Sequence, residues 1–135
     1  TDMVKLGKAM ALGMALLALG AYAARAQDPV KVAPGIYKVL LDNEHLRIVE
    51  VRLPAGGKSP MHAHAAYAIY SFGEAKAKFT SPDGKTADVE IHAGQTMWRD
   101  AEIHSAENTG TTEIHVLNIE LKPAAPAAAP KGKKE

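Results

Sequence analysis

Three histidines are the residues of this chain whose type and spacing are best suited to chemistry. His62 and His64 are separated by one residue, and His104 follows later in the sequence. Residues two apart in a β-strand project from the same face about 6–7 Å apart, so the first pair aims both imidazoles at one point. Neutral imidazole binds zinc, copper, iron and nickel, and three protein ligands leave coordination positions free for water or substrate. The sequence therefore predicts an open site for one divalent transition metal.

The composition narrows the kind of protein that could carry this site. The chain has 135 residues, a formal net charge of +1 and no cysteine. Its length fits one domain with a sizeable core, and a near-neutral charge without a basic stripe makes nucleic acid a poor partner. Without thiols there are no disulfides, thiolate zinc sites or iron–sulfur clusters. We therefore expect histidine and carboxylate chemistry on a small molecule.

The N-terminal segment has the pattern of a secretory signal peptide. Lys5 and Lys8 precede an apolar stretch over residues 9–24, and a cleavage pattern A-x-A ends at Ala26. The alternative, a membrane anchor, is disfavoured because the apolar stretch is shorter than the roughly 20 residues that a span needs. We predict a signal peptide over residues 1–26, a periplasmic or secreted protein, and no stable membrane span after cleavage.

Beyond residue 26 the sequence alternates short β-type segments with turn signals. Leu46 to Leu53 is rich in β-branched residues, and Asp83-Gly84 is typical of a hairpin turn. Many short strands at regular spacing favour a sandwich or barrel. The expected strands cover residues 46–53, 61–72, 75–80, 86–91, 96–99, 103–108 and 113–121. We predict an all-β domain over residues 27–122 and a disordered Pro/Ala/Lys-rich tail over residues 123–135.

The spacing of glycines and histidines resembles the two-part signature of the cupin superfamily. In the first part Gly56 is followed by five residues and then by His62-Ala63-His64. In the second part Gly94 leads to His104, and Asn108 follows after a gap of three residues. The resemblance to a small single-domain cupin implies a β-barrel of the double-stranded β-helix, or jelly-roll, type with these histidines as metal ligands.

The chain departs from the cupin signature in two places. No carboxylate stands near Ala68 and Ile69, where the family usually places a glutamate ligand, and Asp100 and Glu102 replace the usual proline and glycine of the second part. The resemblance therefore implies a reduced site with three histidines and no glutamate. Cupins of that kind include iron dioxygenases, so iron is the favoured metal, while zinc, nickel, manganese and copper remain alternatives.

The remaining histidines and two polar residues are weaker candidates for the site. His115 shares the parity of the apolar residues in the last predicted strand, which would place it inside the barrel as a fourth ligand. Gln95 and Glu102 could contact the metal ligands. His45 and His92 stand alone and are expected to be ordinary side chains.

Four further residues are candidates for a substrate pocket. Tyr67 and Tyr70 follow the histidine pair, so the inward-facing parity would supply an aromatic wall, with ordinary core packing as the alternative. Trp98 could cover the mouth of the barrel. Arg47 could anchor an anionic substrate, with a solvated surface position as the alternative.

Two functions fit these residues. The favoured hypothesis is an exported ferrous-iron dioxygenase that binds a small organic substrate through two oxygen atoms in the open metal positions. The alternative is a non-catalytic periplasmic module that captures a small ligand or a metal ion, which the missing glutamate and the atypical second part favour. Under both hypotheses the partner is a small molecule, and the resemblance to cupins makes a homodimer plausible.

Overall fold

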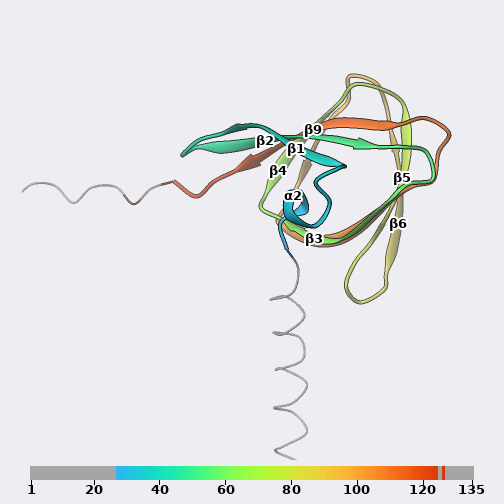
Figure 1. Cartoon of the computed structure of the whole chain (residues 1–135), viewed down its shortest axis with the longest axis horizontal. Helices are drawn as coiled ribbons and strands as arrows, with labels where there is room; N and C mark the ends of the chain where they lie inside the picture. Colours follow the sequence, from blue (N-terminus) through green and yellow to red (C-terminus); the bar gives the residue numbers. More distant parts are fainter. Residues whose placement is uncertain (1–26, 125, 127–135) are drawn as a thin grey trace, which may run out of the picture.

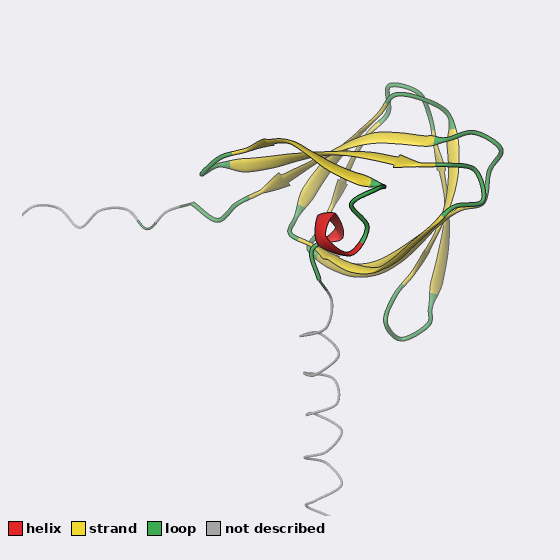
Figure 2. Cartoon of the chain, viewed as in Figure 1, coloured by secondary structure: helices red, strands yellow, loops and turns green. Residues whose placement is uncertain are grey.

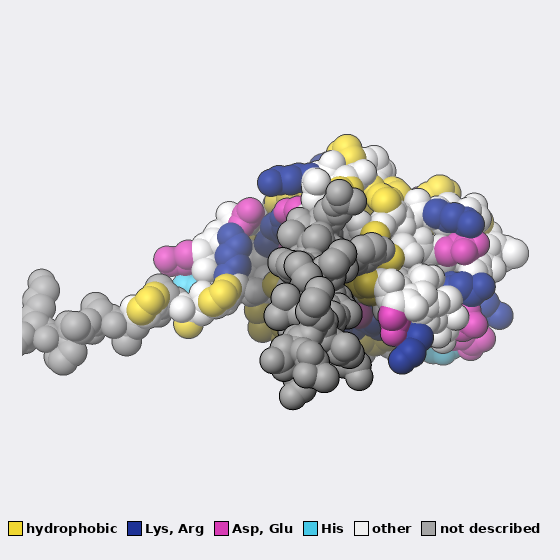
Figure 3. Space-filling view, turned by 90° about the horizontal axis from the view of Figure 1, so that it is seen from below, with side chains coloured by type: hydrophobic (Ala, Val, Ile, Leu, Met, Phe, Trp, Pro, Cys, Tyr) yellow, Lys and Arg dark blue, Asp and Glu magenta, His cyan; other side chains and the backbone are white. Residues whose placement is uncertain are grey.

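The computed structural model describes residues 27–124 and 126 of the chain. The predicted signal peptide and most of the predicted tail lie outside these residues, so both stay predictions. Within the described ranges, no helix is long and apolar enough to cross a membrane. Figure 3 shows one face of the molecule, where acidic and basic side chains are interspersed.

The described part of the chain consists of one short helix and nine strands (Figures 1 and 2). Helix α2, Pro29–Val32, begins at the N-cap Asp28, and a proline in its first turn fits this start. The strands are β1 (Tyr37–Asp42), β2 (Leu46–Leu53), β3 (Lys58–His64), β4 (Tyr67–Ser71), β5 (Ala75–Thr80), β6 (Thr86–Ile91), β7 (Thr96–Arg99), β8 (Glu102–Asn108) and β9 (Ile114–Leu121). The all-β prediction is confirmed.

The strands form two antiparallel sheets that enclose one interior. The five-stranded sheet has the order β1-β2-β9-β4-β7, and the four-stranded sheet has the order β3-β8-β5-β6. Strands distant in sequence lie side by side, since β2 pairs with β9 and β3 pairs with β8. Figure 1 shows α2 beside β3 and β1 at one end of the barrel. This arrangement is a jelly-roll barrel.

The strand predicted over residues 61–72 is two strands in the structure. β3 ends at His64 and β4 begins at Tyr67, and the chain crosses from the four-stranded to the five-stranded sheet between them. The two residues between these strands, Ala65 and Ala66, are both alanine, and neither is one of the residue types, such as glycine, proline or asparagine, that usually mark a turn. The histidine pair and the aromatic residues that follow it therefore belong to different sheets.

The barrel interior has an apolar part and a polar part. Val51 and Leu53 of β2 face Val116 and Ile114 of β9 in the apolar part, and all four are buried. Further along the same strands the inward positions become polar, because Asn118 and Glu120 are also buried. Burying polar and charged groups is costly unless they are paired, and Glu120 is paired with Arg47 and His64.

The outer face of the five-stranded sheet carries a row of apolar residues. The strand register places one residue of each strand in this row: Leu41, Ile48, Ile119, Ala68 and Trp98. Leu41 and Trp98, at its two ends, are exposed. A contiguous apolar surface of this kind is typical of a contact site. We call these five residues the outer row.

Candidate metal centre

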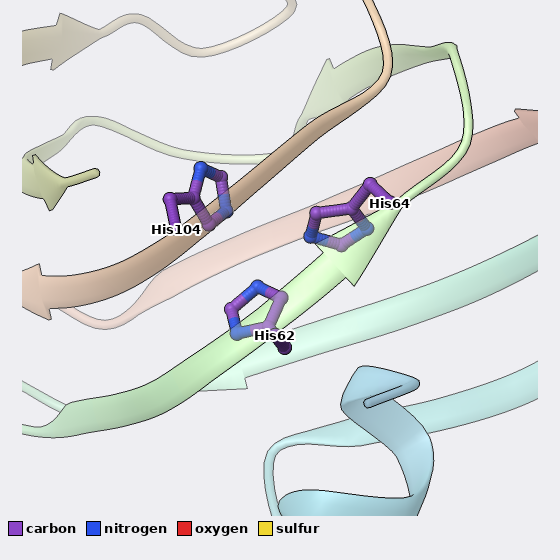
Figure 4. A group of neighbouring side chains, drawn as sticks. All are labelled: His62, His64 and His104. Carbon is purple, nitrogen blue, oxygen red and sulfur yellow. The ribbon is translucent and has the colours of Figure 1, made fainter. Parts of the chain in front are cut away.

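His62, His64 and His104 meet inside the barrel. His62 and His64 lie two positions apart on β3, and the strand register places His104 of β8 opposite His62. The three residues are 0%, 6% and 4% exposed, respectively. One nitrogen of each ring lies within 4.8 Å of those of the other two, and Figure 4 shows the rings facing one another. The structure thus brings together the three histidines that the sequence singled out.

A local irregularity in β3 orients the first histidine. The register between β3 and β8 shifts between Ser59 and His62, and Pro60 lies within this shift on an edge strand, where its missing N–H is tolerated. The Pro60 carbonyl oxygen lies 2.7 Å from Nδ1 of His62. Because a carbonyl can only accept, Nδ1 carries the ring proton and Nε2 keeps its lone pair.

Carboxylates face Nδ1 of the other two histidines. Oε1 of Glu120 lies 3.1 Å from Nδ1 of His64 and accepts a hydrogen bond from its N–H. Oε1 of Glu102 lies 3.3 Å from Nδ1 of His104, but the angles are outside hydrogen-bond geometry. An acceptor beside Nδ1 is the usual arrangement behind a metal-bound histidine, because it fixes the ring and leaves Nε2 for the ion. The donor set therefore fits a metal held by three Nε2 atoms.

The hydroxyl of Tyr37 lies close to Nε2 of His62. Its hydroxyl lies 3.3 Å from Nε2 and 2.8 Å from Oγ of Ser59. Burial raises the pKa of Tyr37 to about 12, so the hydroxyl keeps its proton. That proton can be donated to Ser59, which leaves Nε2 of His62 available to an ion.

Burial favours the neutral form of His62 and His104. Burial lowers the pKa of His62 to about 4, and the neighbouring His64 and His104 act in the same direction, against the Pro60 carbonyl. Burial also lowers the pKa of His104, against the opposing effect of Glu102. Neutral imidazole is the form that binds a metal ion. The rings of His62 and His104 are therefore ready to bind at neutral pH.

The stability of the metal-free protein is expected to fall as the pH drops from about 6.5 to about 4. The pKa of His62 is about 4 in the folded state, whereas it is about 6.5 in an unfolded chain. The unfolded state binds more protons in this window, so stability is full above pH 6.5 and is lost towards pH 4, by on the order of 3 kcal/mol. Urea unfolding at several pH values measures the loss.

The matched variants for this pH experiment are His62→Gln and His45→Gln. His45 is exposed, so its variant should keep the pH dependence of the wild type. His62→Gln should reduce it, and an unchanged pH dependence in that variant would contradict the assignment. Because protons compete with a metal for the same nitrogens, metal retention should also fall as the pH drops.

The histidine group borders a small and mostly apolar cavity. Its volume is about 50 Å³, and its lining includes His64, His104, Tyr67, Phe79 and Met97. A space of this size holds a few water molecules or an equally small ligand. A larger hollow of about 350 Å³ lies elsewhere at the surface. It is lined by residues 74–76, 90–92 and 109–112, and by none of the three histidines.

Tyr67 is the predicted pocket residue that lines this cavity. It is buried, and its hydroxyl donates to Oε1 of Glu102 at 2.7 Å. Glu102 also accepts from Arg99 at 2.7 Å, and it lies beside His104, as the sequence predicted for a residue that contacts a metal ligand. Gln95 does not do so, because its side chain accepts the backbone N–H of His92 in a surface turn.

Tyr70 and Trp98 do not line the cavity, and this corrects the prediction. They are 39% and 55% exposed. The inward-facing residues of β4 are Tyr67, Ile69 and Ser71, so Tyr70 faces outward and packs against Phe72. Trp98 lies opposite Ala68 on the outer face, and its Nε1 donates to Asp100. The parity of β4 that the structure turns inward is that of Tyr67, which leaves Tyr70 on the outer face.

His115 also lies away from the three histidines. The buried positions of β9 are those of Ile114, Val116, Asn118 and Glu120, so His115 faces the outside. Its Nε2 lies 3.1 Å from Oε2 of Glu50, and its ring stacks on Phe72 with centroids 4.4 Å apart. The structure therefore does not support a fourth histidine ligand.

Arg47 faces the interior, but its guanidinium is paired with two carboxylates of the chain itself and not with an open pocket. Its guanidinium lies 2.6 Å from Asp28 and 2.7 Å from Glu120. Sequence reasoning missed both carboxylates. Glu120 stands between Ile119 and Leu121, so it resembled a solvent-facing position in an amphipathic strand. The shared parity of Asn118 and Glu120 was the only sequence signal that a polar inner surface was present.

Comparison with known proteins supports the fold. The chain matches no family model, and the search of curated proteins found no match. A cupin domain from Bordetella pertussis is 27% identical over 65% of this chain and 93% of that chain, with a TM-score of 0.60. An RmlC-like cupin family protein with a double-stranded β-helix fold from Methanocaldococcus jannaschii is 15% identical over 64% of this chain and 78% of that chain, with a TM-score of 0.52.

A third similar structure is an uncharacterized conserved protein with a double-stranded β-helix domain from Klebsiella pneumoniae. It is 15% identical over 72% of this chain and 89% of that chain, with a TM-score of 0.52. The fold is therefore the cupin-type double-stranded β-helix, as the sequence predicted. Its interior carries three histidines that could hold a metal ion.

Proposed function

We propose that this protein is an exported metal-binding cupin that holds one divalent transition metal with His62, His64 and His104. The observation that carries the proposal is the orientation of the rings. Each Nδ1 faces an oxygen, from Pro60, Glu120 or Glu102, and one nitrogen of each buried ring lies within 4.8 Å of those of the other two. Three neutral nitrogen ligands suit iron, zinc, nickel or copper, and they leave further coordination positions open.

We favour iron and an oxygen-dependent oxidation of a small organic substrate. Bound iron would supply a Lewis acid and a one-electron redox centre. The chain itself supplies the surroundings: Phe79 and Met97 give the cavity an apolar lining, and the hydroxyl of Tyr67 is held by Glu102 at the cavity wall. The resemblance to three-histidine cupins supports this choice of chemistry.

Metal analysis followed by oxygen uptake tests both levels of the proposal. The protein is purified from its native compartment and its metal content is measured. Oxygen uptake by the iron-loaded protein is then followed with diketones, catechols and small organic acids, with the matched variant His104→Ala as the control. Uptake by the wild type alone supports a dioxygenase. Stoichiometric metal without uptake for any compound contradicts it and leaves metal binding.

The size of the cavity favours a second candidate function. At about 50 Å³ the space is well below the roughly 300 Å³ of a typical pocket for a small organic ligand. A non-catalytic module that captures a metal ion, or an ion with a very small ligand, requires no more room. Retention of metal together with no exchange of metal-bound water would distinguish this function from catalysis.

Export and pairing are further parts of the proposal. Export rests on the signal-peptide pattern of residues 1–26. We place the contact between two copies of the chain on the outer row, because its exposed ends, Leu41 and Trp98, extend an apolar surface across all five strands of one sheet. Self-association would remove this surface from water.

A further inference from the structure

A chain of charged side chains connects the N-terminal segment of the domain to one of the three histidines. Oδ2 of Asp28 lies 2.6 Å from Nη1 of Arg47, and Oδ1 lies 3.2 Å from Nη2. On its other side Arg47 donates from Nε to Oε2 of Glu120 at 2.7 Å. The second oxygen of Glu120 accepts from Nδ1 of His64 at 3.1 Å. Asp28, Arg47 and Glu120 are called the ionic relay below.

The ionic relay becomes more buried towards the histidine. The side chain of Asp28 is 30% exposed, that of Arg47 is 17% exposed and that of Glu120 is 7% exposed. A buried carboxylate is costly unless its oxygens are paired, and both oxygens of Glu120 are paired here. Because the guanidinium is a rigid planar fork, fixing one side of Arg47 with Asp28 also fixes the direction of the donors that reach Glu120.

The charges of the ionic relay do not cancel. Two carboxylates share one guanidinium, which leaves one net negative charge beside Nδ1 of His64. A negative charge there stabilises positive charge on the far side of the imidazole, where Nε2 would hold a cation. The relay therefore both orients His64 and makes it a stronger ligand.

The first residue of the ionic relay is held in place by the segment around α2. Asp28 caps α2, since its Oδ1 accepts from the backbone N–H of Val30 at 2.9 Å. The preceding Gln27 forms a bridge with His62, and its carbonyl accepts from the N–H of Ala63 at 3.0 Å. The segment therefore contacts β3 directly at the strand that carries two of the histidines.

We infer that Asp28, Arg47 and Glu120 are positioning residues for His64. We also infer that the segment over residues 27–33 contributes to the metal centre by holding Asp28 in place. This inference rests on the proposed function, because it assigns the relay to the orientation of a metal ligand. The relay is specific to His64, since His62 is oriented by the Pro60 carbonyl and His104 lies beside Glu102.

Zn²⁺ affinity tests the inference in the full chain. Glu120→Gln keeps the shape but loses the charge, and it should weaken Zn²⁺ binding by about 10–100-fold, as loss of a partner behind a ligand usually does. Asp28→Asn retains a good helix cap and should weaken binding by a smaller factor in the same direction. The matched control is Glu113→Gln, which removes an exposed ion pair with Arg52 and should leave the affinity unchanged.

A second measurement on metal-free protein separates positioning from overall stability. The ¹⁵N shifts of the His64 ring report which nitrogen carries the proton. The wild type should show the Nδ1–H form, and Glu120→Gln should lower its population while the His62 ring, oriented by a carbonyl, is unchanged. An unchanged His64 ring in Glu120→Gln would overturn the inference even if that variant were unstable.

The outcomes distinguish the inference from the proposed function. If the wild type binds Zn²⁺ and Glu120→Gln binds it equally well, the positioning role is wrong and the metal site stands. If Asp28→Asn alone is without effect, the role of the N-terminal segment is wrong. If the wild type binds no Zn²⁺ while the ring shifts respond to Glu120→Gln, the relay still orients His64 and the proposed function fails.

Discussion

Replacing His104 with alanine is expected to lower the affinity for Fe²⁺ or Zn²⁺ by about 100-fold or more, because it removes one of the three nitrogens that we propose hold the metal. His104 is 4% exposed, so its ring is enclosed by the protein. Two remaining histidines on one strand cannot surround an ion. Competition titration with a chromogenic chelator measures the affinity, and thermal unfolding of the metal-free variant shows that it is folded.

The matched control for this experiment is His115→Ala. This variant also removes a histidine from a strand next to the interior, but its ring faces outward and contacts Glu50 and Phe72. We expect the wild-type metal affinity. A loss in His115→Ala comparable with that in His104→Ala would show that the ligand set is wrong and that the barrel rearranges on metal binding.

The three histidines could be found from sequence because their arrangement depends on local rules. The one-residue spacing of His62 and His64 places both rings on one face of any strand, and the turn residues at positions 54–57 mark where that strand begins. His104 required the resemblance to a known signature, since nothing in its own neighbourhood shows that β8 pairs with β3. The all-β character followed from the same period-two alternation.

The pocket residues were harder to predict because their facing depends on distant partners. The crossing at Ala65 and Ala66 changes the sheet without a turn signal, so the facing of Tyr70 could not be carried forward from the histidine pair. In β9 the positions that share the parity of Leu117 and Ile119 are mostly apolar, so the sequence predicts that this face is buried. The opposite parity can be buried because Arg47, 73 positions away in sequence, pairs with Glu120. No local pattern contains that information.

The largest expected loss of stability follows from replacing Asn108 with alanine. Asn108 is 1% exposed. Its amide nitrogen donates to the carbonyls of Leu53 and Thr112 at 2.9 and 2.8 Å, and its Oδ1 accepts from the N–H of Gly110 at 3.0 Å. Alanine leaves all three backbone groups without this partner in a region with little water, so we expect a loss of about 2–4 kcal/mol in the free energy of unfolding.

Asn43→Ala is the matched control, since the Asn43 side chain also satisfies backbone groups, the N–H groups of His45 and Leu46, but at an exposed turn. Water can replace the Asn43 side chain there, so the free energy of unfolding of Asn43→Ala should fall by no more than about 1 kcal/mol. Urea unfolding measures both variants.

Asn108 also joins the end of β8 to the turn before β3, because its backbone pairs with Gly56 and Gly57. A loss in Asn108→Ala no larger than in Asn43→Ala would mean that this junction, and hence the approach of β3 to β8 that brings the histidines together, is held by the backbone alone.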